Sequence, residues 1–330
     1  MDDQDKRLLN AIQADFPLAS RPFQALGASL ALSEGEVIDR IASLKQQKVV
    51  RQISAIFDTR SLGYKSSLVA MRVQPDRLAV PPSSDLQWTV ERLHTMTGAD
   101  STRILPTLRL FKIGVQLDME GKSGAEREEP REAGYSDVRR PAAGPAGLRG
   151  VDIAAIHELQ GDFPLVPEPY RPMADRMGLS EESPFEVARH LQGQGYLRRV
   201  AAVLHHREAG FRANAMGVWV VPPQRAEEVG KIMGSFRGVS HCYLRPTYPD
   251  WLYNIFTMVH GQKAKDCQEI ISAISAATGI TEYALLYSTK EYKKVRLKYF
   301  TPELDEWEAQ ARQSAGAAPL DHGMLAANPR

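Results

Sequence analysis

The sequence contains two copies of one module, placed at a constant offset of 147 residues. The segment Ile-Gln-Ala-Asp-Phe-Pro-Leu at 12–18 returns as Leu-Gln-Gly-Asp-Phe-Pro-Leu at 159–165. Farther along, Arg51 meets Arg198 and Val73 meets Val220, with no gap between these positions. Self-similarity that holds at one offset over such a length predicts that the chain folds as a tandem of related units.

The offset changes later in the modules. The segment Arg-Leu-Phe-Lys at 109–112 best matches Lys-Glu-Tyr-Lys at 290–293, which is an offset of 181. The first copy is therefore shorter by about 34 residues, the difference between the two offsets, and the gap falls after about Leu78. The missing part is the counterpart of 226–259, and the sequence leaves open whether this shortening is genuine.

Each copy begins with a pattern typical of a winged helix-turn-helix. In the first copy, Leu8 and Ile12 share a helical face, and a second short helix follows Pro22. Ser33 and Glu36 form a capping-box pattern that opens a third helix, and 49–58 is an extended wing. Three short helices and a wing predict a winged helix-turn-helix at 1–60 and again at 151–207.

A different pattern follows each wing. In the second copy it alternates strand, helix, two strands, helix and strand, which predicts a ferredoxin-like βαββαβ domain at 208–307. In the first copy, 61–120 keeps only the first strand, the second helix and the last strands. This shortened sheet should borrow an edge from its partner. The segment 121–150 predicts a mobile linker and 308–330 a frayed tail. The fold class is thus α+β.

Composition excludes several classes of protein. The formal net charge is +1, whereas nucleic-acid binding usually accompanies a strong basic excess. No stretch approaches the roughly 20 apolar residues that span a bilayer, and no secretory signal is visible at the N-terminus. Only two cysteines occur, Cys242 and Cys267, without metal-ligand spacing. We expect a cytoplasmic protein with no disulfide framework and no metal site.

The segment Gly-Val-Ser-His-Cys-Tyr-Leu-Arg at 238–245 carries the strongest chemical signal. Residues two apart in a strand point to the same face, so His241, Tyr243 and Arg245 should project together. A proton donor near neutral pH, a phenol and a permanent cation suit a ligand with several carboxylates. A sheet-edge histidine beside a surface arginine is the alternative, and the pattern alone leaves it open.

A winged helix-turn-helix followed by a βαββαβ sheet resembles the Lrp/AsnC family of regulators. The segment 238–245, Asp-Phe-Pro-Leu after the first helix, Asn-Ile-Phe at 254–256 and Phe-Lys-Ile-Gly at 111–114 resemble its siroheme decarboxylase branch. The two-copy chain is similar to the fused form found in haem d1 pathways. The resemblance covers nearly the whole chain except the predicted linker and tail.

This resemblance implies a carboxy-lyase that removes the acetate carboxylates at C12 and C18 of sirohaem, giving 12,18-didecarboxysirohaem. The product would serve haem d1 or the alternative haem pathway. The resemblance implies no dissociable cofactor, because iron enters as part of the substrate. It places the essential histidine at His241, and the first copy lacks a counterpart of that residue.

Chemistry supports these roles. Loss of carbon dioxide leaves a carbanion equivalent, and His241 can protonate it with Tyr243 and Arg245 beside it. Carboxylates of the substrate require cations and hydrogen-bond donors. Each candidate could instead be surface or core, and the adjacent His205 and His206 should face opposite ways. The predicted substrate-binding residues are Arg198, Arg199, Tyr248, Trp251, Asn254, Lys290, Lys293 and Lys112.

Two other functions remain open. A DNA-binding regulator would insert the third helix of each module into the major groove, yet those helices start with the acidic segments Ser-Glu-Gly-Glu at 33–36 and Ser-Glu-Glu at 180–182. We therefore expect no nucleic-acid partner. A haem-binding sensor or carrier would use the same site as the enzyme, and only turnover separates the two. The two copies should pair with each other, and a further homo-oligomer is left open.

Overall fold

The computed structural model describes residues 1–64, 67–72, 86–114, 116–121, 123–128, 144–179, 184–288, 296–301 and 306. The chain divides into two compact units. The larger unit comprises Met1–Gly63 and Leu108–Tyr299, and the smaller one Tyr64–Thr107 and Phe300–Arg330. Among the described residues, no helix has the length and apolar character needed to cross a membrane.

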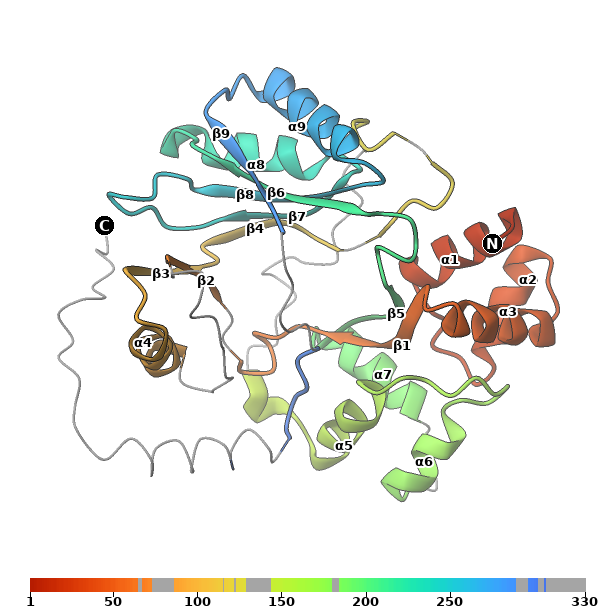
Figure 1. Ribbon diagram of the computed structural model, residues 1–330. Helices are drawn as coiled ribbons and strands as arrows, with labels where there is room; N and C mark the ends of the chain where they lie inside the picture. Colours follow the sequence, from red (N-terminus) through yellow and green to blue (C-terminus); the bar gives the residue numbers. More distant parts are fainter. Residues whose placement is uncertain are drawn as a thin grey trace. The chain divides into compact units, whose positions relative to one another are not determined.

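Both predicted helical modules are present, each with three helices and one wing strand (Figure 1). Ser33 caps its helix as predicted, because its hydroxyl accepts from the Glu36 amide and the Glu36 carboxylate accepts from the Ser33 amide at 2.8 Å. The first module consists of α1 (Asp3–Ala14), α2 (Pro22–Leu30), α3 (Glu34–Gln46) and β1 (Val50–Phe57). The second consists of α5 (Gly150–Leu159), α6 (Arg171–Met177), α7 (Pro184–Gly193) and β5 (Leu197–Leu204).

The two wings pair with each other as an antiparallel ladder, β1 with β5. Ser54 lies opposite Ala201, its own counterpart at the offset of 147, so this pair is the centre of a pseudo-twofold axis. Matching hydrogen bonds flank it: the Phe16 amide donates to the Val200 carbonyl, and the Phe163 amide donates to the Ile53 carbonyl, both at 2.8 Å. The predicted pairing of the two copies is confirmed here.

The five-stranded sheet has the order β4-β7-β8-β6-β9, and helices α8 and α9 cover one of its faces (Figure 1). The βαββαβ order predicted for the second copy is confirmed. The strands are β6 (Ala213–Trp219), β7 (Val239–Leu244), β8 (Ile255–Gly261), β9 (Tyr283–Tyr287) and β4 (Arg109–Ile113), and the helices are η3 (Pro223–Arg225), α8 (Ala226–Gly234) and α9 (Ala264–Thr278).

Strand β4 belongs to the first copy but forms an edge of the second copy's sheet, antiparallel to β7. Its Phe111 packs under α8, where a Cβ added to Gly230 would lie only 2.2 Å from the Phe111 ring. A glycine is therefore needed for this close approach of helix and strand. The core beneath α8 and α9 is apolar, with Val239, Cys242 and Ile271 fully buried.

The smaller unit contains the shortened sheet of the first copy. Strands β2 (Ser67–Arg72) and β3 (Ser101–Pro106) pair antiparallel, and α4 (Leu86–Thr97) contacts both. Pairing of the first strand with a late one parallels the pairing of β6 with β9 in the second copy. In the part of this unit that the structure describes, a two-stranded sheet with one helix is a small basis for independent stability.

The segment predicted as a mobile linker is docked where the structure describes it. The Gly238 amide donates to the Gly124 carbonyl at 2.9 Å, and the Glu128 amide donates to the Ser235 carbonyl at 2.8 Å. Arg237 also forms an ion pair with Glu128. A short helix, η2 (Gly144–Gly147), precedes α5. Backbone bonding, which composition does not reveal, thus orders part of the predicted linker.

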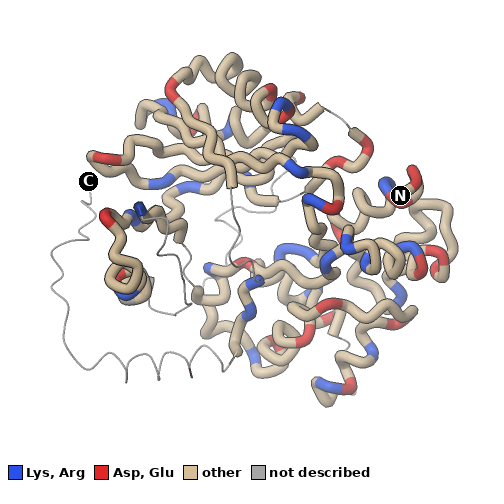
Figure 2. The backbone as a smooth tube through the Cα atoms, viewed as in Figure 1, with Lys and Arg blue, Asp and Glu red and all other residues tan. Residues whose placement is uncertain are grey.

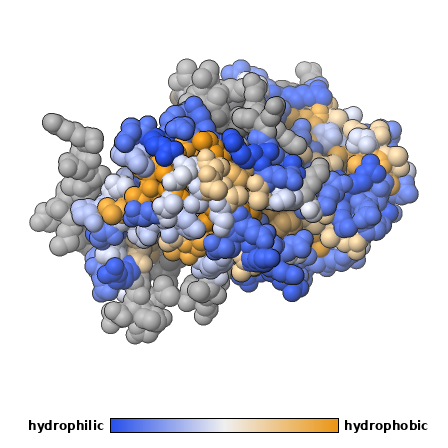
Figure 3. Space-filling model, turned by 90° about the horizontal axis from the view of Figure 1, so that it is seen from above, coloured by the Kyte–Doolittle hydropathy of each residue, from blue (hydrophilic) through white to orange (hydrophobic). Residues whose placement is uncertain are grey.

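The exposed surface mixes polar and apolar residues. Figure 3 shows apolar residues exposed among hydrophilic ones. Large apolar side chains with more than half their area exposed include Leu108 at 59% and Leu252 at 55%. Singly exposed apolar residues of this kind are ordinary in folded proteins and identify no site by themselves.

Candidate functional site

His241, Tyr243 and Arg245 share one face of β7, as predicted from their alternation. The rings of His241 and Tyr243 stack with centroids 5.8 Å apart, and the Arg245 guanidinium carbon lies 4.8 Å from the centre of the Tyr243 ring. Cys242 points the other way, toward α8, where its thiol lies 3.6 Å from the Gly230 carbonyl oxygen. The three polar side chains therefore lie on the sheet face opposite α8 and α9.

The apolar part of this face comes from the strand that pairs with β7. The centre of the Phe256 ring on β8 lies 5.5 Å from the guanidinium carbon of Arg245. Trp251 stacks on Phe256, with ring centroids 6.4 Å apart. Tyr248 and Trp251 bond each other's backbone and close a turn between β7 and β8. The Trp251 indole Nε1 is buried and has no hydrogen-bond partner among the described atoms. A ligand oxygen would satisfy that donor.

Surroundings of His241 oppose its protonation in the free protein. Burial is the largest cause, and the positive charges of Arg198 and Lys112 add to it, lowering the pKa of His241 to about 4. Its Nδ1 lies 2.9 Å from the Ser240 hydroxyl. His241 is therefore a half-buried, neutral imidazole whose hydrogen-bonded neighbour is a serine rather than a carboxylate.

Several arginines of the larger unit are desolvated. Burial lowers the pKa of Arg199, Arg245 and Arg296, and it is the largest cause for each. The nearby Asp15 acts in the opposite direction on Arg199, and the positive charge of Arg60 adds to the lowering of the Arg245 pKa. Arg296 donates to the Ser54 hydroxyl and the Ala55 carbonyl, so it serves the wing, whereas the Arg245 guanidinium lies over the Tyr243 ring and is suited to binding a carboxylate.

Two of the predicted substrate ligands have bonds within the fold. The Asn254 amide donates to the Val221 carbonyl at 2.8 Å and accepts from the Val221 amide at 2.9 Å. The Lys112 ammonium donates to the Phe236 carbonyl at 2.7 Å. A substrate contact by Asn254 would have to displace one of its two bonds. Lys112 acts on His241 through its charge, and Lys290 and Lys293 lie outside the described residues.

Sequence reasoning missed three polar residues beside His241. The Ser240 hydroxyl lies 2.7 Å from Nε2 of His260, and Nδ1 of His260 bonds the Asn214 side-chain oxygen. A register shift between Val239 and His241 marks a bulge, which lets the neighbouring residues Ser240 and His241 touch. His260 could have been predicted to share a sheet face with Phe256, because the two lie an even number of residues apart on one strand. The bulge beside His241 has no recognisable pattern in the sequence.

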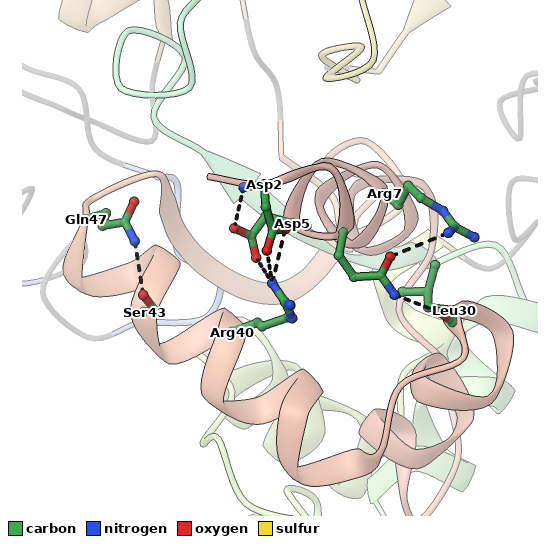
Figure 4. A network of polar contacts seen from close by, with 8 residues as sticks. Asp2, Asp5, Arg7, Leu30, Arg40, Ser43 and Gln47 are labelled. Carbon is green, nitrogen blue, oxygen red and sulfur yellow. Dashed lines mark hydrogen bonds and ion pairs between the residues drawn. The ribbon is translucent and has the colours of Figure 1, made fainter.

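The third helix of the first module is poorly suited to bind DNA. Arg40 on α3 forms ion pairs with Asp2 at 2.9 Å and Asp5 at 2.7 Å (Figure 4). The start of α3 carries Glu34 and Glu36, which would repel phosphate. Along the described part of the tube in Figure 2, lysines and arginines are mixed with acidic residues. The acidic segment 180–182 lies outside the described residues.

Comparisons with known proteins agree with this architecture. Residues 208–293 match the AsnC-like ligand binding domain, and 5–51 and 152–198 each match the siroheme decarboxylase NirDL-like HTH domain. A siroheme decarboxylase from Hydrogenobacter thermophilus is 36% identical, over 93% of this chain and 98% of its own length. A siroheme decarboxylase beta subunit from Methanosarcina barkeri is 43% identical over 44% of this chain and 97% of its own length.

A solved structure covers both copies. The crystal structure of the siroheme decarboxylase NirDL in complex with an iron-uroporphyrin III analogue is 30% identical and superposes with a TM-score of 0.66, covering 95% of this chain and all of that chain. Fold and site together define a tandem protein with helix-turn-helix modules and an AsnC-like ligand-binding domain. Given these relatives, the chain belongs to the siroheme decarboxylase family.

Proposed function

We propose that this chain removes the acetate carboxylates at C12 and C18 of sirohaem and releases 12,18-didecarboxysirohaem. The observation that carries the proposal is the shared face of His241, Tyr243 and Arg245, with the positive charges of Arg198 and Lys112 acting on His241. Family membership and the porphyrin analogue bound by a relative support a tetrapyrrole as the ligand. Iron would reach the site only as part of the substrate.

In this proposal the arginines hold the substrate and His241 completes the chemistry. Arg245, supported by the Tyr243 and Phe256 rings, binds a carboxylate and fixes the orientation of the macrocycle. Trp251 supplies apolar surface and one hydrogen-bond donor. When the carbon–carbon bond to a carboxylate breaks, the electron pair stays on the methylene carbon, and a proton from His241 converts that carbon into a methyl group.

The copies are proposed to act as one assembly. Wing strands β1 and β5 pair within the chain, and β4 of the first copy forms an edge strand of the sheet that carries His241. Relatives such as the Methanosarcina barkeri beta subunit match only one copy of this tandem. We place the reaction in the cytoplasm, a proposal supported by the two buried, unbridged cysteines, Cys242 and Cys267.

Anaerobic incubation of the purified protein with sirohaem, followed by mass spectrometry, tests the proposal. Two successive losses of one carbon dioxide each are expected. His241→Ala should slow them by about 10²- to 10⁴-fold, the range typical of a lost general acid. His205→Ala, an exposed histidine on a nearby loop, serves as the matched control.

Tight binding of sirohaem without loss of mass would contradict the proposed enzymatic function and would indicate a carrier or a sensor instead. Absence of binding would contradict a tetrapyrrole ligand altogether. Equal rates for His241→Ala and the wild type would leave the reaction standing but remove His241 from it.

A further inference from the structure

A continuous hydrogen-bonded chain leads away from His241 on the side of Nδ1. The Ser240 hydroxyl lies 2.9 Å from Nδ1 of His241 and 2.7 Å from Nε2 of His260. Nδ1 of His260 bonds the side-chain oxygen of Asn214. The His260 ring also lies 6.4 Å from that of His206, on the loop after β5. Four polar side chains from β6, β7 and β8 are thus lined up in order: Asn214, His260, Ser240 and His241.

The chemistry of these atoms fixes the direction of the bonds. The Asn214 side-chain oxygen can only accept, so Nδ1 of His260 carries a proton. Nε2 of His260 is therefore the atom that gains or loses a proton, and it faces Ser240. A serine hydroxyl can donate one hydrogen bond while accepting another. It can therefore pass a proton between the two imidazoles without carrying charge itself.

The proposed reaction needs a supply of protons that His241 alone is poorly placed to provide. Each decarboxylation consumes one proton, yet Arg198 from β5 and Lys112 from β4 disfavour a charged His241. Tyr243 on β7, stacked on the ring, supplies no negative charge to offset them when it is a neutral phenol. His260 is partly exposed and sits one hydroxyl away from His241. It is better placed to collect a proton from solvent.

We propose that His260 stores the proton for decarboxylation and that Ser240 relays it to His241, with Asn214 holding His260 in the required tautomer. This inference rests on the proposed function. In the step, the His241 Nε2–H bond breaks and the proton joins the methylene carbon as carbon dioxide leaves. The Ser240 proton moves to Nδ1 of His241, and the Nε2 proton of His260 moves to Ser240. His260 ends neutral and His241 ends with its proton on Nδ1, so before the next decarboxylation His260 is reprotonated by solvent and His241 returns to its Nε2–H tautomer.

Ser240→Ala removes the relay atom and leaves both histidines in place. We expect kcat to fall about 10- to 100-fold, part of the usual contribution of proton transfer, while the KM for sirohaem changes little. Ser240→Thr keeps a hydroxyl and should recover most of the rate. Ser275→Ala on α9 also loses a hydrogen-bonded hydroxyl in the same domain, and it should leave kcat unchanged.

His260→Gln tests the proton store. Wild-type activity should decline as pH rises and His260 loses its proton, whereas the Gln variant should be slow throughout and lack this pH dependence. The double variant Ser240→Ala/His260→Gln should be no slower than the slower single variant, because both break one path. A full kcat in Ser240→Ala, or independent effects that multiply, would overturn the relay.

Imidazole ¹⁵N shifts separate this inference from the proposed function, because they need no substrate. In the wild type, titration of His260 should move the His241 Nδ1 resonance, and Ser240→Ala should abolish that response. If the His241 resonance ignores the titration of His260 in the wild type, the relay is wrong even for an active decarboxylase. If the response is present in a chain that does not turn over sirohaem, the relay stands and the proposed function fails.

Discussion

Gly230 on α8 lies against Phe111 of strand β4, where the second copy meets the first. Replacing it with alanine would place a Cβ 2.2 Å from the Phe111 ring, closer than any real contact. We expect Gly230→Ala to lower the free energy of unfolding by about 1–3 kcal/mol, the usual cost of overpacking. Chemical denaturation monitored by circular dichroism measures the change.

Gly193 at the end of α7 is the matched control, because nothing lies within 4 Å of an added Cβ there. Gly193→Ala should be neutral or slightly stabilising, since alanine favours helix. The double variant Gly230→Ala/Phe111→Leu should recover part of the loss. Equal stability of Gly230→Ala and the wild type would contradict the docking of β4 under α8.

The free energy of unfolding should depend on pH because the pKa of His241 is lowered on folding, and the direction of that shift fixes the sign of the dependence. The pKa of His241 is about 4 in the folded chain and 6.5 in its ordinary state. Between these values the unfolded chain binds a proton that the folded chain does not, so stability falls as pH drops from about 6.5 toward 4. The loss attributable to His241 should be about 2–3 kcal/mol, at 1.36 kcal/mol per pKa unit.

Denaturation curves of the wild type and His241→Gln at several pH values isolate this contribution. The variant should lose less stability than the wild type over the same pH range. His205→Gln removes an exposed histidine and should match the wild type. A parallel decline in all three proteins would show that the imidazole of His241 protonates freely in the folded state.

At this scale, period-two alternation in the sequence was sufficient to predict that His241, Tyr243 and Arg245 share a face. Ser240 could not be predicted, because the alternation assigns it to the opposite face and only the bulge beside His241 brings it back. His260 depends on the register between β7 and β8, which is a tertiary property. Asn254 has the residue type of a ligand, yet its bonds to Val221 serve the fold.

Among the elements, the paired wings hold the two helical modules together. Phe163 is fully buried and packs edge-on against Phe16 of the other copy, with ring centroids 5.8 Å apart. We expect Phe163→Ala to lower the free energy of unfolding by about 3–5 kcal/mol, because it removes a large buried ring. Urea denaturation checks the value.

Phe185→Ala provides the comparison for that variant. Phe185 is only half-buried and packs against Tyr170 within one copy, so its loss should be clearly smaller. If both variants lose the same stability, the contact between the two Asp-Phe-Pro segments contributes nothing specific to the pairing of the wings.

Helix boundaries could largely be predicted from the sequence, because Ser33, Pro22 and the apolar stripes are local signals. Strand partners were not. The shortened sheet of the first copy was predicted to borrow an edge from its partner, and this was wrong: among the described strands β2 and β3 pair only with each other, and β4 of the first copy instead adds an edge to the second copy's sheet beside β7. Strand β8 begins at Ile255, because Tyr248 and Trp251 close a turn before it.

For the whole molecule, the proposed ligand should act as a stabiliser. Sirohaem that binds only the folded chain should raise the free energy of unfolding by about 2.7 kcal/mol at a free concentration of 100 times Kd. Thermal unfolding at increasing sirohaem concentrations measures this shift. Because the contacts are between arginines and carboxylates, added salt should weaken the effect.

A porphyrin without carboxylates is the control ligand for that measurement. It can pack on Trp251 and Phe256 but cannot engage Arg245 or its neighbours, so it should shift the melting temperature much less. Equal shifts for both ligands would show that apolar contact alone governs binding and would remove the arginines from the site.

The ladder between β1 and β5, centred on Ser54 and Ala201, joins two halves that a single backbone already connects. Such a joint has no dissociation equilibrium, since each half meets the other at an effective concentration set by the tether rather than by the cell. Specific activity should therefore persist on dilution. Tethering also relaxes selection on either half alone. Either half can therefore contribute through its wing alone, and the first copy also contributes strand β4 to the sheet of the other.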